Sequence, residues 1–200
     1  MDTSYGKVFI ASMNMRGTWA TYPRNCKVIN VTSMQKKDSL FRRDFSPMTI
    51  IEGGYKGFCC FENYWQSGKV FENIDHEISL QWWKNQTSGK RRYPPGKNKK
   101  ILYSLFNDCV KRNYIQSRKQ IYVPEYYELM INTESIFNVK TILESGKDIV
   151  IFDFDGPRTA EGNPDCKLFT QELYNEKIND ITFPFGHGYI VAAALYGIQI

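Results

Sequence analysis

The order of apolar and polar residues predicts a chain built mainly of helices with a few strands. Residues 148–155 (DIVIFDFD) are apolar nearly throughout, which predicts a strand at the centre of a sheet. Residues 7–12 and 26–32 are apolar or β-branched runs that predict two further strands. Elsewhere apolar positions repeat at helical spacing, and the expected helices cover residues 61–71, 76–84, 101–115, 135–144, 168–178 and 189–196, with another starting at Pro124.

These elements predict the fold class α+β. We expect a single domain over residues 1–200, mainly helical with a small sheet. Residues 87–100 are expected to form a mobile loop, because they contain Pro94-Pro95-Gly96 with Lys and Arg on both sides.

Residues 61–71 (FENYWQSGKVF) carry two stripes when they are wound as a helix. Positions 61, 64, 65, 68 and 71 form an aromatic stripe of the kind that faces a core. Beside it, Glu62, Gln66 and Lys69 place a carboxylate, an amide and an amine in line. This second stripe is either a site built on a rigid element or the solvated face of an ordinary amphipathic helix, and the periodicity does not decide between them.

The composition restricts the compartment, the cofactors and the partners that we expect. The five cysteines are scattered without a Cys-x-x-Cys pair, which is typical of reduced thiols in a cytoplasm-like compartment. Together with only two histidines, this argues against a structural zinc site, and we expect no metal and no cofactor. The chain has neither an apolar run of membrane-spanning length nor a secretory-signal pattern at its N-terminus, so we expect no membrane partner.

Positive charge is concentrated in residues 84–119. This segment has eleven Lys or Arg and one acid, Asp108, whereas the whole chain has a net charge of only +5. Such a segment indicates an anionic partner, either the phosphates of a nucleotide or those of a nucleic acid. A solvated loop that improves solubility is the alternative.

Two short motifs also suggest chemistry. The strand that ends in Asp153-Phe154-Asp155-Gly156 resembles the motif of haloacid-dehalogenase-type phosphatases, in which the first Asp is the nucleophile and the pair holds magnesium. Only 45 residues follow Asp155 and they offer no second strand ending in an acidic pair, so this is the weaker alternative. The two acids otherwise form the edge of a site or cap a loop.

The turn Gly186-His187-Gly188 precedes the last expected helix. Backbone N–H groups at a helix N-terminus bind anions, and glycines allow a ligand to approach the backbone. His187 is either an acid/base group or a residue of the turn. The glycines are either part of a phosphate site or needed for the packing of Ala192, Ala193 and Ala194.

Taken in order, several motifs resemble the NADAR (YbiA-like) family over residues 45–197. The matching segments are Phe45-Ser46-Pro47, residues 61–66 with Lys69, Arg118 ahead of Ile121-Tyr122, residues 143–150, and residues 185–188 before the C-terminal helix. The chain departs from the family pattern in three places. Asp153 stands where a Glu is expected, Phe185 replaces a Trp, and the acid that precedes that Trp has no clear counterpart.

The resemblance implies a NADAR-like fold and an N-glycosidase that cleaves the bond between C1 of a ribose phosphate or ADP-ribose and a nitrogen. Glu62 would stabilise the oxocarbenium character at C1 or act as general acid/base. Lys69 would form a Schiff base with the opened ribose. Asp153 is the third catalytic candidate. Phe45 or Trp65 would stack on a base, Gln66 and Asp155 would contact the substrate, and Arg118 with Gly186, His187 and Gly188 would hold phosphate.

We therefore expect Glu62, Lys69, Asp153 and Gly186 to converge on one pocket. The main alternative is a non-catalytic protein that binds a nucleotide or nucleic acid through residues 84–119. The weaker alternative is a magnesium-dependent phosphatase that uses Asp153 and Asp155.

Overall fold

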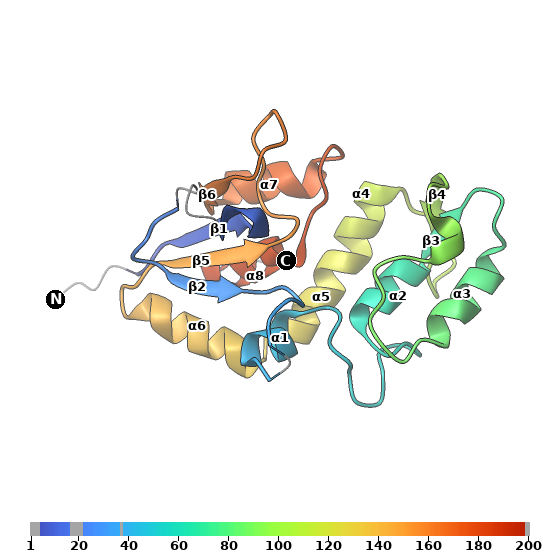
Figure 1. The fold of residues 1–200 in the computed structure, drawn as a ribbon, viewed down its shortest axis with the longest axis horizontal. Coiled ribbons are helices and arrows are strands. Elements are labelled where there is room, and N and C mark those ends of the chain that lie inside the picture. The colour runs from blue at the N-terminus through green and yellow to red at the C-terminus, as the bar shows by residue number, and fades with distance from the viewer. Residues whose placement is uncertain (1–4, 17–21, 37, 199–200) are drawn as a thin grey trace. The chain divides into compact units, whose positions relative to one another are not determined.

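The computed structural model describes residues 5–16, 22–36 and 38–198, and these residues fold into two units (Figure 1). The first unit combines residues 1–46 with residues 123–200, and the second consists of residues 47–122. The first contains a four-stranded mixed sheet and the second a two-stranded sheet, and helices make up most of the remaining regular structure. The predicted α+β class, mainly helical with a small sheet, is confirmed.

The sheet of the first unit has the strand order β2-β5-β1-β6. β5 pairs in parallel with both β1 and β2, whereas β6 runs antiparallel to β1. All five residues of β5 are buried, which confirms that the apolar run near residue 150 is the central strand. The strands are β1 (Val8–Ser12), β2 (Lys27–Asn30), β5 (Ile149–Asp153) and β6 (Cys166–Leu168).

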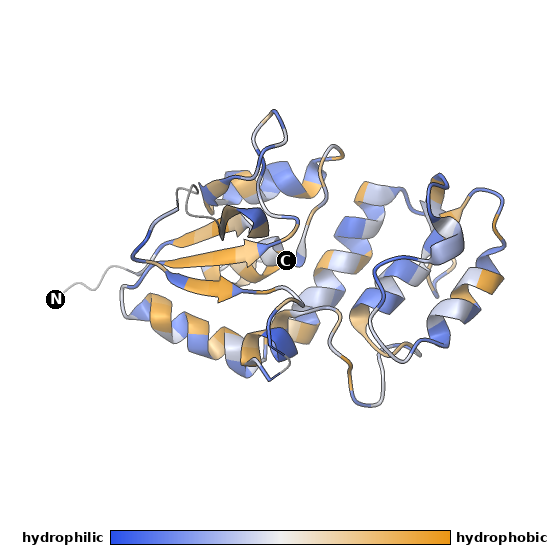
Figure 2. Ribbon diagram, viewed as in Figure 1, coloured by the Kyte–Doolittle hydropathy of each residue, from blue (hydrophilic) through white to orange (hydrophobic). Residues whose placement is uncertain are grey.

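One buried helix forms part of the core of the first unit. α8 is buried from His187 to Leu195 and packs against β1 and β5, and its three alanines allow that close packing. Figure 2 shows the apolar residues concentrated in these strands. The other helices of this unit are α1 (Leu40–Phe45), α5 (Val123–Met130), α6 (Glu134–Glu144) and α7 (Gln171–Asn179), and α8 itself spans His187–Tyr196.

The second unit is built around an aromatic core. Phe61, Tyr64 and Trp65 turn inward from one face of α2 and meet Phe106 and Tyr122. Its elements are α2 (Phe61–Ser67), β3 (Lys69–Phe71), α3 (His76–Lys84), a 3-10 turn (Pro94–Gly96), β4 (Ile101–Ser104), α4 (Tyr114–Ser117) and a π-helical turn (Arg118–Tyr122). The predicted aromatic stripe is therefore core, and the predicted helix at residues 76–84 is confirmed.

The predicted helix over residues 61–71 is too long. α2 ends at Ser67, and Lys69 belongs to β3 rather than to the helix. Gly68 lies so close to the Phe106 ring that a Cβ there would overlap it, and its carbonyl accepts a hydrogen bond from the N–H of Leu105 at 2.7 Å. Pairing with the second strand thus overrides the helical periodicity, and glycine is a poor helix former in any case.

The predicted helix over residues 101–115 is wrong. β4 (Ile101–Ser104) occupies its first part and pairs with β3, and a turn follows. The helix begins only at α4 (Tyr114–Ser117), where Asn113 and Gln116 form a capping box that stops it from extending further back. The apolar spacing at the start of this segment fits a strand in contact with a partner as well as it fits a helix.

α5 begins at Val123, one residue before the predicted helix start at Pro124. The helical structure itself starts earlier than predicted. α4, the π-helical turn and α5 follow one another without interruption. Proline has no N–H and its ring clashes with the carbonyl four residues earlier, and a wider turn before Pro124 relieves that clash. Within the part of the chain that the structure describes, no helix combines the length and apolar character needed to cross a bilayer.

Candidate functional site

Glu62, Gln66 and Lys69 form a hydrogen-bonded chain on the second unit. The side-chain amide of Gln66 donates from Nε2 to Glu62 Oε1 at 2.7 Å, and Gln66 Oε1 accepts from Lys69 Nζ at 2.6 Å. All three side chains are partly exposed. The predicted line of carboxylate, amide and amine is therefore present, although Lys69 reaches it from β3 instead of from the helix.

The amide of Gln66 fixes the roles of its two neighbours. A carboxylate only accepts hydrogen bonds and an ammonium only donates them, so the Gln66 side chain has one orientation that satisfies both. It separates Glu62 from Lys69 and holds each at a defined place. Preorganised charged groups of this kind favour a reaction in which charge develops between them.

The polar face of α2 is held outward by the core beneath it. The Trp65 ring lies 4.8 Å from the Tyr122 ring and 5.9 Å from the Phe106 ring, measured between centroids. The N–H of Glu62 donates to the carbonyl of Pro47 at 2.8 Å, which fixes the start of the helix. Trp65 is only 8% exposed, so its predicted stacking on a ligand would require the ring to leave the core.

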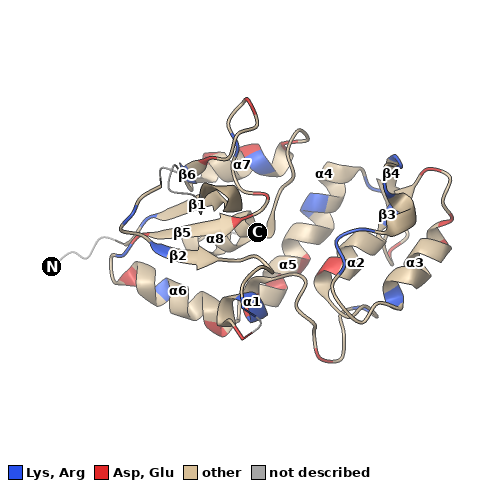
Figure 3. Cartoon of the chain, viewed as in Figure 1, with Lys and Arg blue, Asp and Glu red and all other residues tan. Residues whose placement is uncertain are grey.

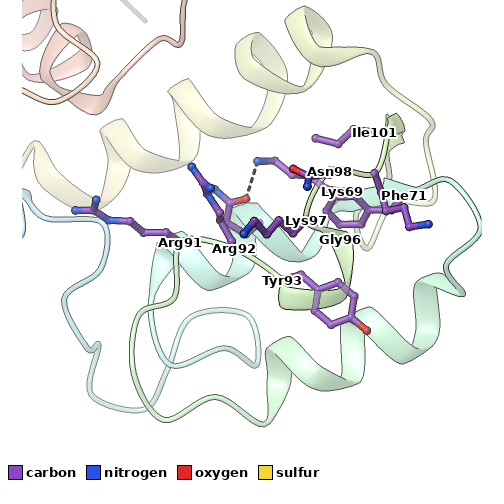
Figure 4. Close-up of a pocket in the computed structure, with 11 residues that line it drawn as sticks. Lys69, Phe71, Arg91, Arg92, Tyr93, Gly96, Lys97, Asn98 and Ile101 are labelled. Atoms are coloured by element: carbon purple, nitrogen blue, oxygen red, sulfur yellow. Dashed lines mark hydrogen bonds between the residues drawn. The ribbon is translucent and has the colours of Figure 1, made fainter.

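A hollow of about 380 Å³ opens beside this chain (Figure 4). We call it the basic hollow, because five of its eleven lining residues are Lys or Arg and none is an acid. It is lined by Gln66, Lys69, Phe71, Arg91, Arg92, Tyr93, Gly96, Lys97, Asn98, Lys99 and Ile101. Two members of the hydrogen-bonded chain therefore line the hollow, and Glu62 adjoins it through Gln66.

Asn63 ties the basic loop to α2. Its side chain is buried, donates to the carbonyl of Ser88 at 3.1 Å and accepts from the N–H of Lys90 at 2.8 Å. These bonds fix the backbone immediately before Arg91 and Arg92. Asn63 belongs to neither of the two stripes predicted for this helix, so no sequence pattern singled it out as a functional residue.

Aromatic packing forms the floor of the basic hollow. The ring of Tyr93 lies 6.2 Å from that of Phe71 and 5.3 Å from that of Trp82. Gly96 lies close enough to Phe71 that an added Cβ would be 2.9 Å from its ring. Asn63 thus holds the start of the loop over residues 87–100, and the close approach of Gly96 to Phe71 holds it farther along. These contacts fix the backbone that carries the cations of the loop.

In the first unit, a carboxylate lies at the N-terminus of α8. Asp153, at the end of β5, is 1% exposed and accepts at Oδ2 from the N–H of Gly188 at 2.7 Å. His187 Nε2 lies 2.8 Å from the carbonyl oxygen of Val31, which can only accept, so this nitrogen donates. His187 Nδ1 then faces Asp153 Oδ2 at 3.5 Å. The anion at this helix end is therefore the protein's own carboxylate.

The two glycines of the turn are needed for this approach. A Cβ on Gly186 would overlap Asp153 Oδ2 and would lie 2.9 Å from the Cβ of Asp155. A Cβ on Gly188 would lie 2.8 Å from that of Asp153. Such distances are shorter than real Cβ contacts, so both positions exclude larger residues.

Tyr126 closes the same region. Its hydroxyl donates to the carbonyl of Phe45 at 2.6 Å, and its ring lies 5.6 Å from that of His187. Burial, together with the charge of Asp153, holds the pKa of Tyr126 well above its usual value. Phe45 has no exposed surface, so its predicted stacking on a base would require movement of the ring.

The predicted site residues therefore fall into two groups. Glu62, Trp65, Gln66, Lys69 and Arg118 belong to the second unit, whereas Phe45, Asp153, Asp155, Gly186, His187 and Gly188 belong to the first. Their convergence on one pocket stays a prediction. Arg118 is buried, with its guanidinium carbon 4.5 Å from the centroid of the Tyr114 ring. Its predicted contact with phosphate also stays a prediction.

Among the described residues, no group of three or more His, Cys, Asp or Glu side chains is placed to hold a metal ion. The chain matches no protein-family model, no curated protein and no solved structure.

Proposed function

We propose that the protein is an N-glycosidase that hydrolyses the C1–N bond of a ribose-phosphate or ADP-ribosyl compound. The observation that carries the proposal is the Glu62–Gln66–Lys69 chain, which opens onto a hollow lined by five cations. A carboxylate beside a cationic pocket suits a substrate that is anionic at one end and develops positive charge at its reacting carbon.

The basic hollow binds the phosphate end of the substrate. Arg91 and Arg92 present planar guanidinium groups that pair with phosphate oxygens, and Lys97 adds a point charge. Holding this end fixes the position of the sugar, which removes much of the entropy that the reaction would otherwise lose.

Glu62 acts on the reacting carbon. As the C1–N bond breaks, its electron pair leaves with the nitrogen and C1 gains positive charge, which the Glu62 carboxylate stabilises. Water then adds to C1 and transfers a proton to Glu62, which passes this proton to the departed nitrogen and becomes a carboxylate again. Gln66 keeps the carboxylate in place through its 2.7 Å hydrogen bond.

Lys69 offers a covalent route at the same carbon. After losing a proton from the ammonium form, its amine attacks C1 as the C1–N bond breaks, and the departing nitrogen takes the electron pair and the proton that the attacking amine gives up. Opening of the sugar ring then gives a Schiff base, which water hydrolyses to the free sugar and the amine. Borohydride reduces such an adduct to a stable secondary amine. We therefore expect protein with Lys69 to be trapped during turnover and Lys69→Ala to escape trapping.

The decisive test is Glu62→Gln. This change keeps the size of the side chain and removes the charge, so we expect kcat to fall at least about a hundredfold while substrate binding survives. Activity is measured as release of free base from a ribosylamino-pyrimidine phosphate, or of ADP-ribose from ADP-ribosylated guanosine.

Glu72→Gln is the matched control, because Glu72 is exposed and belongs to the same unit, and it should retain full activity. Full activity in Glu62→Gln would remove Glu62 from the mechanism. No release from either substrate by the unmodified protein would contradict the proposal.

The second candidate is a non-catalytic binder of nucleotides or nucleic acid. It is favoured by the positive charge of the second unit, which contains thirteen Lys and Arg but only six Asp and Glu. Figure 3 shows where charged residues lie along the chain. Binding to duplex DNA would weaken by about 0.9 log unit per log unit of salt for each neutralised phosphate. Charge reversal at Arg91, Arg92 and Lys97 would then flatten this dependence, and an affinity independent of salt would contradict the candidate.

The phosphatase alternative has less support. It needs Asp153 as a nucleophile, but this carboxylate is 1% exposed and already accepts a hydrogen bond from the N–H of Gly188.

A further inference from the structure

A second hollow adjoins the basic hollow on the same unit. It also measures about 380 Å³ and is lined by Lys69, Ile101, Leu102, Tyr103, Ser104, Asn113 and Tyr114. Lys69 is its one charged member, so we call it the apolar hollow. Lys69 and Ile101 line both hollows, and these two residues therefore lie where the hollows meet.

An irregularity in strand pairing creates the apolar hollow. Lys69 pairs with Ser104 and Val70 with Tyr103, but Phe71 pairs with Ile101, so that Leu102 is the extra residue of a bulge. Bulges redirect side chains and are common beside functional sites. Here the bulge leaves Leu102 48% exposed without a partner residue on β3.

The opposite wall comes from the start of α4. Tyr114 is the first residue of this helix, directly after the Asn113 cap, and it is 44% exposed. The guanidinium carbon of Arg118 lies 4.5 Å from the centroid of its ring, so the cation packs against one side of the ring. Ile101, Leu102 and Tyr114 thus gather three half-exposed apolar side chains around one hollow, whereas such residues are usually scattered over a surface.

From this arrangement we infer that the apolar hollow binds the leaving group as a planar aromatic heterocycle, with Tyr114 and Leu102 as the residues that determine specificity. The inference rests on the proposed function and deepens it. An aromatic base stacks on a ring such as that of Tyr114 whatever polar groups the base carries, and an aliphatic side chain covers the other face of the base. With phosphate in the basic hollow and the base in the apolar hollow, C1 lies beside Lys69.

The test compares two ligands in binding experiments that need no turnover. Guanosine 5′-monophosphate carries both a phosphate and a base, whereas ribose 5-phosphate carries the phosphate alone. Their affinities are measured by calorimetry for the unmodified protein, Tyr114→Ala and Leu102→Ser. We expect Tyr114→Ala to weaken the binding of the nucleotide by about tenfold, as loss of one stacked base contact does. Binding of ribose 5-phosphate should change less than about twofold.

Two controls sharpen the comparison. Arg92→Gln in the basic hollow should weaken both ligands equally. Ile78→Ser should weaken neither, because Ile78 is 64% exposed in the same unit but lines neither hollow. Equal effects of Tyr114→Ala on the two ligands, no effect on either, or no binding of the nucleotide by the unmodified protein would each overturn the inference. Turnover and its loss in Glu62→Gln report separately on the proposed function.

Discussion

Replacing Gly188 by Ala should loosen the end of α8 that faces the sheet. The new methyl group would lie 2.8 Å from the Cβ of Asp153 and 3.0 Å from its Oδ2, so the helix end must move away. That movement lengthens the hydrogen bond from the N–H of Gly188 to the buried carboxylate, which is 2.7 Å in the native protein.

The loss of stability at this helix end is the sum of three free-energy contributions. Loss of a hydrogen bond to a charged group costs about 1.5–3 kcal/mol, and an extra methyl group in a packed interior costs about 1–3 kcal/mol. The better helix propensity of Ala returns at most about 1 kcal/mol. The net loss is therefore about 2–5 kcal/mol, which corresponds to an increase of about 30-fold or more in local opening.

Hydrogen–deuterium exchange of peptides from α8 measures this opening directly. Gly162→Ala is the control. Gly162 has φ +84, so Ala is strained there, but its added Cβ meets only Phe183 at 3.9 Å and should leave α8 unaffected. Asp153→Asn keeps an acceptor for Gly188 and should have a smaller effect. Protection of α8 in Gly188→Ala within about threefold of the unmodified protein would refute the structural role assigned to Asp153.

Three further outcomes are expected. Gln66→Leu removes both hydrogen bonds that orient the proposed catalytic groups, so kcat for base release should fall by about tenfold or more, and an unchanged kcat would exclude this role for the amide. The hydrogen bond from Arg112 lowers the pKa of Asp108 from 3.8 to about 2, so the unfolding midpoint of the native protein should exceed that of Asp108→Asn at neutral pH. This difference should vanish as the pH falls from about 4 to about 2. Burial raises the pKa of Cys60 to about 12, so iodoacetamide should label the exposed Cys109 first, and early labelling of Cys60 would contradict its burial.

The elements that could be predicted from the sequence are those whose local pattern agrees with their packing. β5 is apolar at its first four positions because both of its faces are covered, and the run of residues 148–155 indicated this. α6 is amphipathic and is followed by Gly146 at φ +81, so both its face and its end were predictable. α3 was predictable for the same kind of reason, with Asp75 as its N-cap.

The misplaced boundaries come from contacts between residues distant in sequence. Nothing near Gly68 reveals that Phe106 lies against it, yet this contact ends α2 and starts β3. The same strand pairing converts residues 101–104 from an expected helix into β4. Local periodicity describes how a segment is covered but not which segment covers it.

The candidate site was likewise only partly predictable from the sequence. The charge of residues 84–119 predicts an anionic ligand, which stays a prediction, and four cations of this segment line one hollow together with Lys69. What the sequence did not show was that Asn63 fixes the loop beside Gln66 and Lys69, because that contact joins residues 63 and 90 through a single buried amide.

The sheet order of the first unit also determines when that unit can fold during synthesis. β1 and β2 do not pair with each other, and both form their parallel ladders with β5, which begins at Ile149. The ribosome therefore completes residues 47–122 before the chain contains the strand that the first two strands need. Until then β1 and β2 remain unpaired apolar segments, the kind of exposed edge to which chaperones bind and from which aggregation starts.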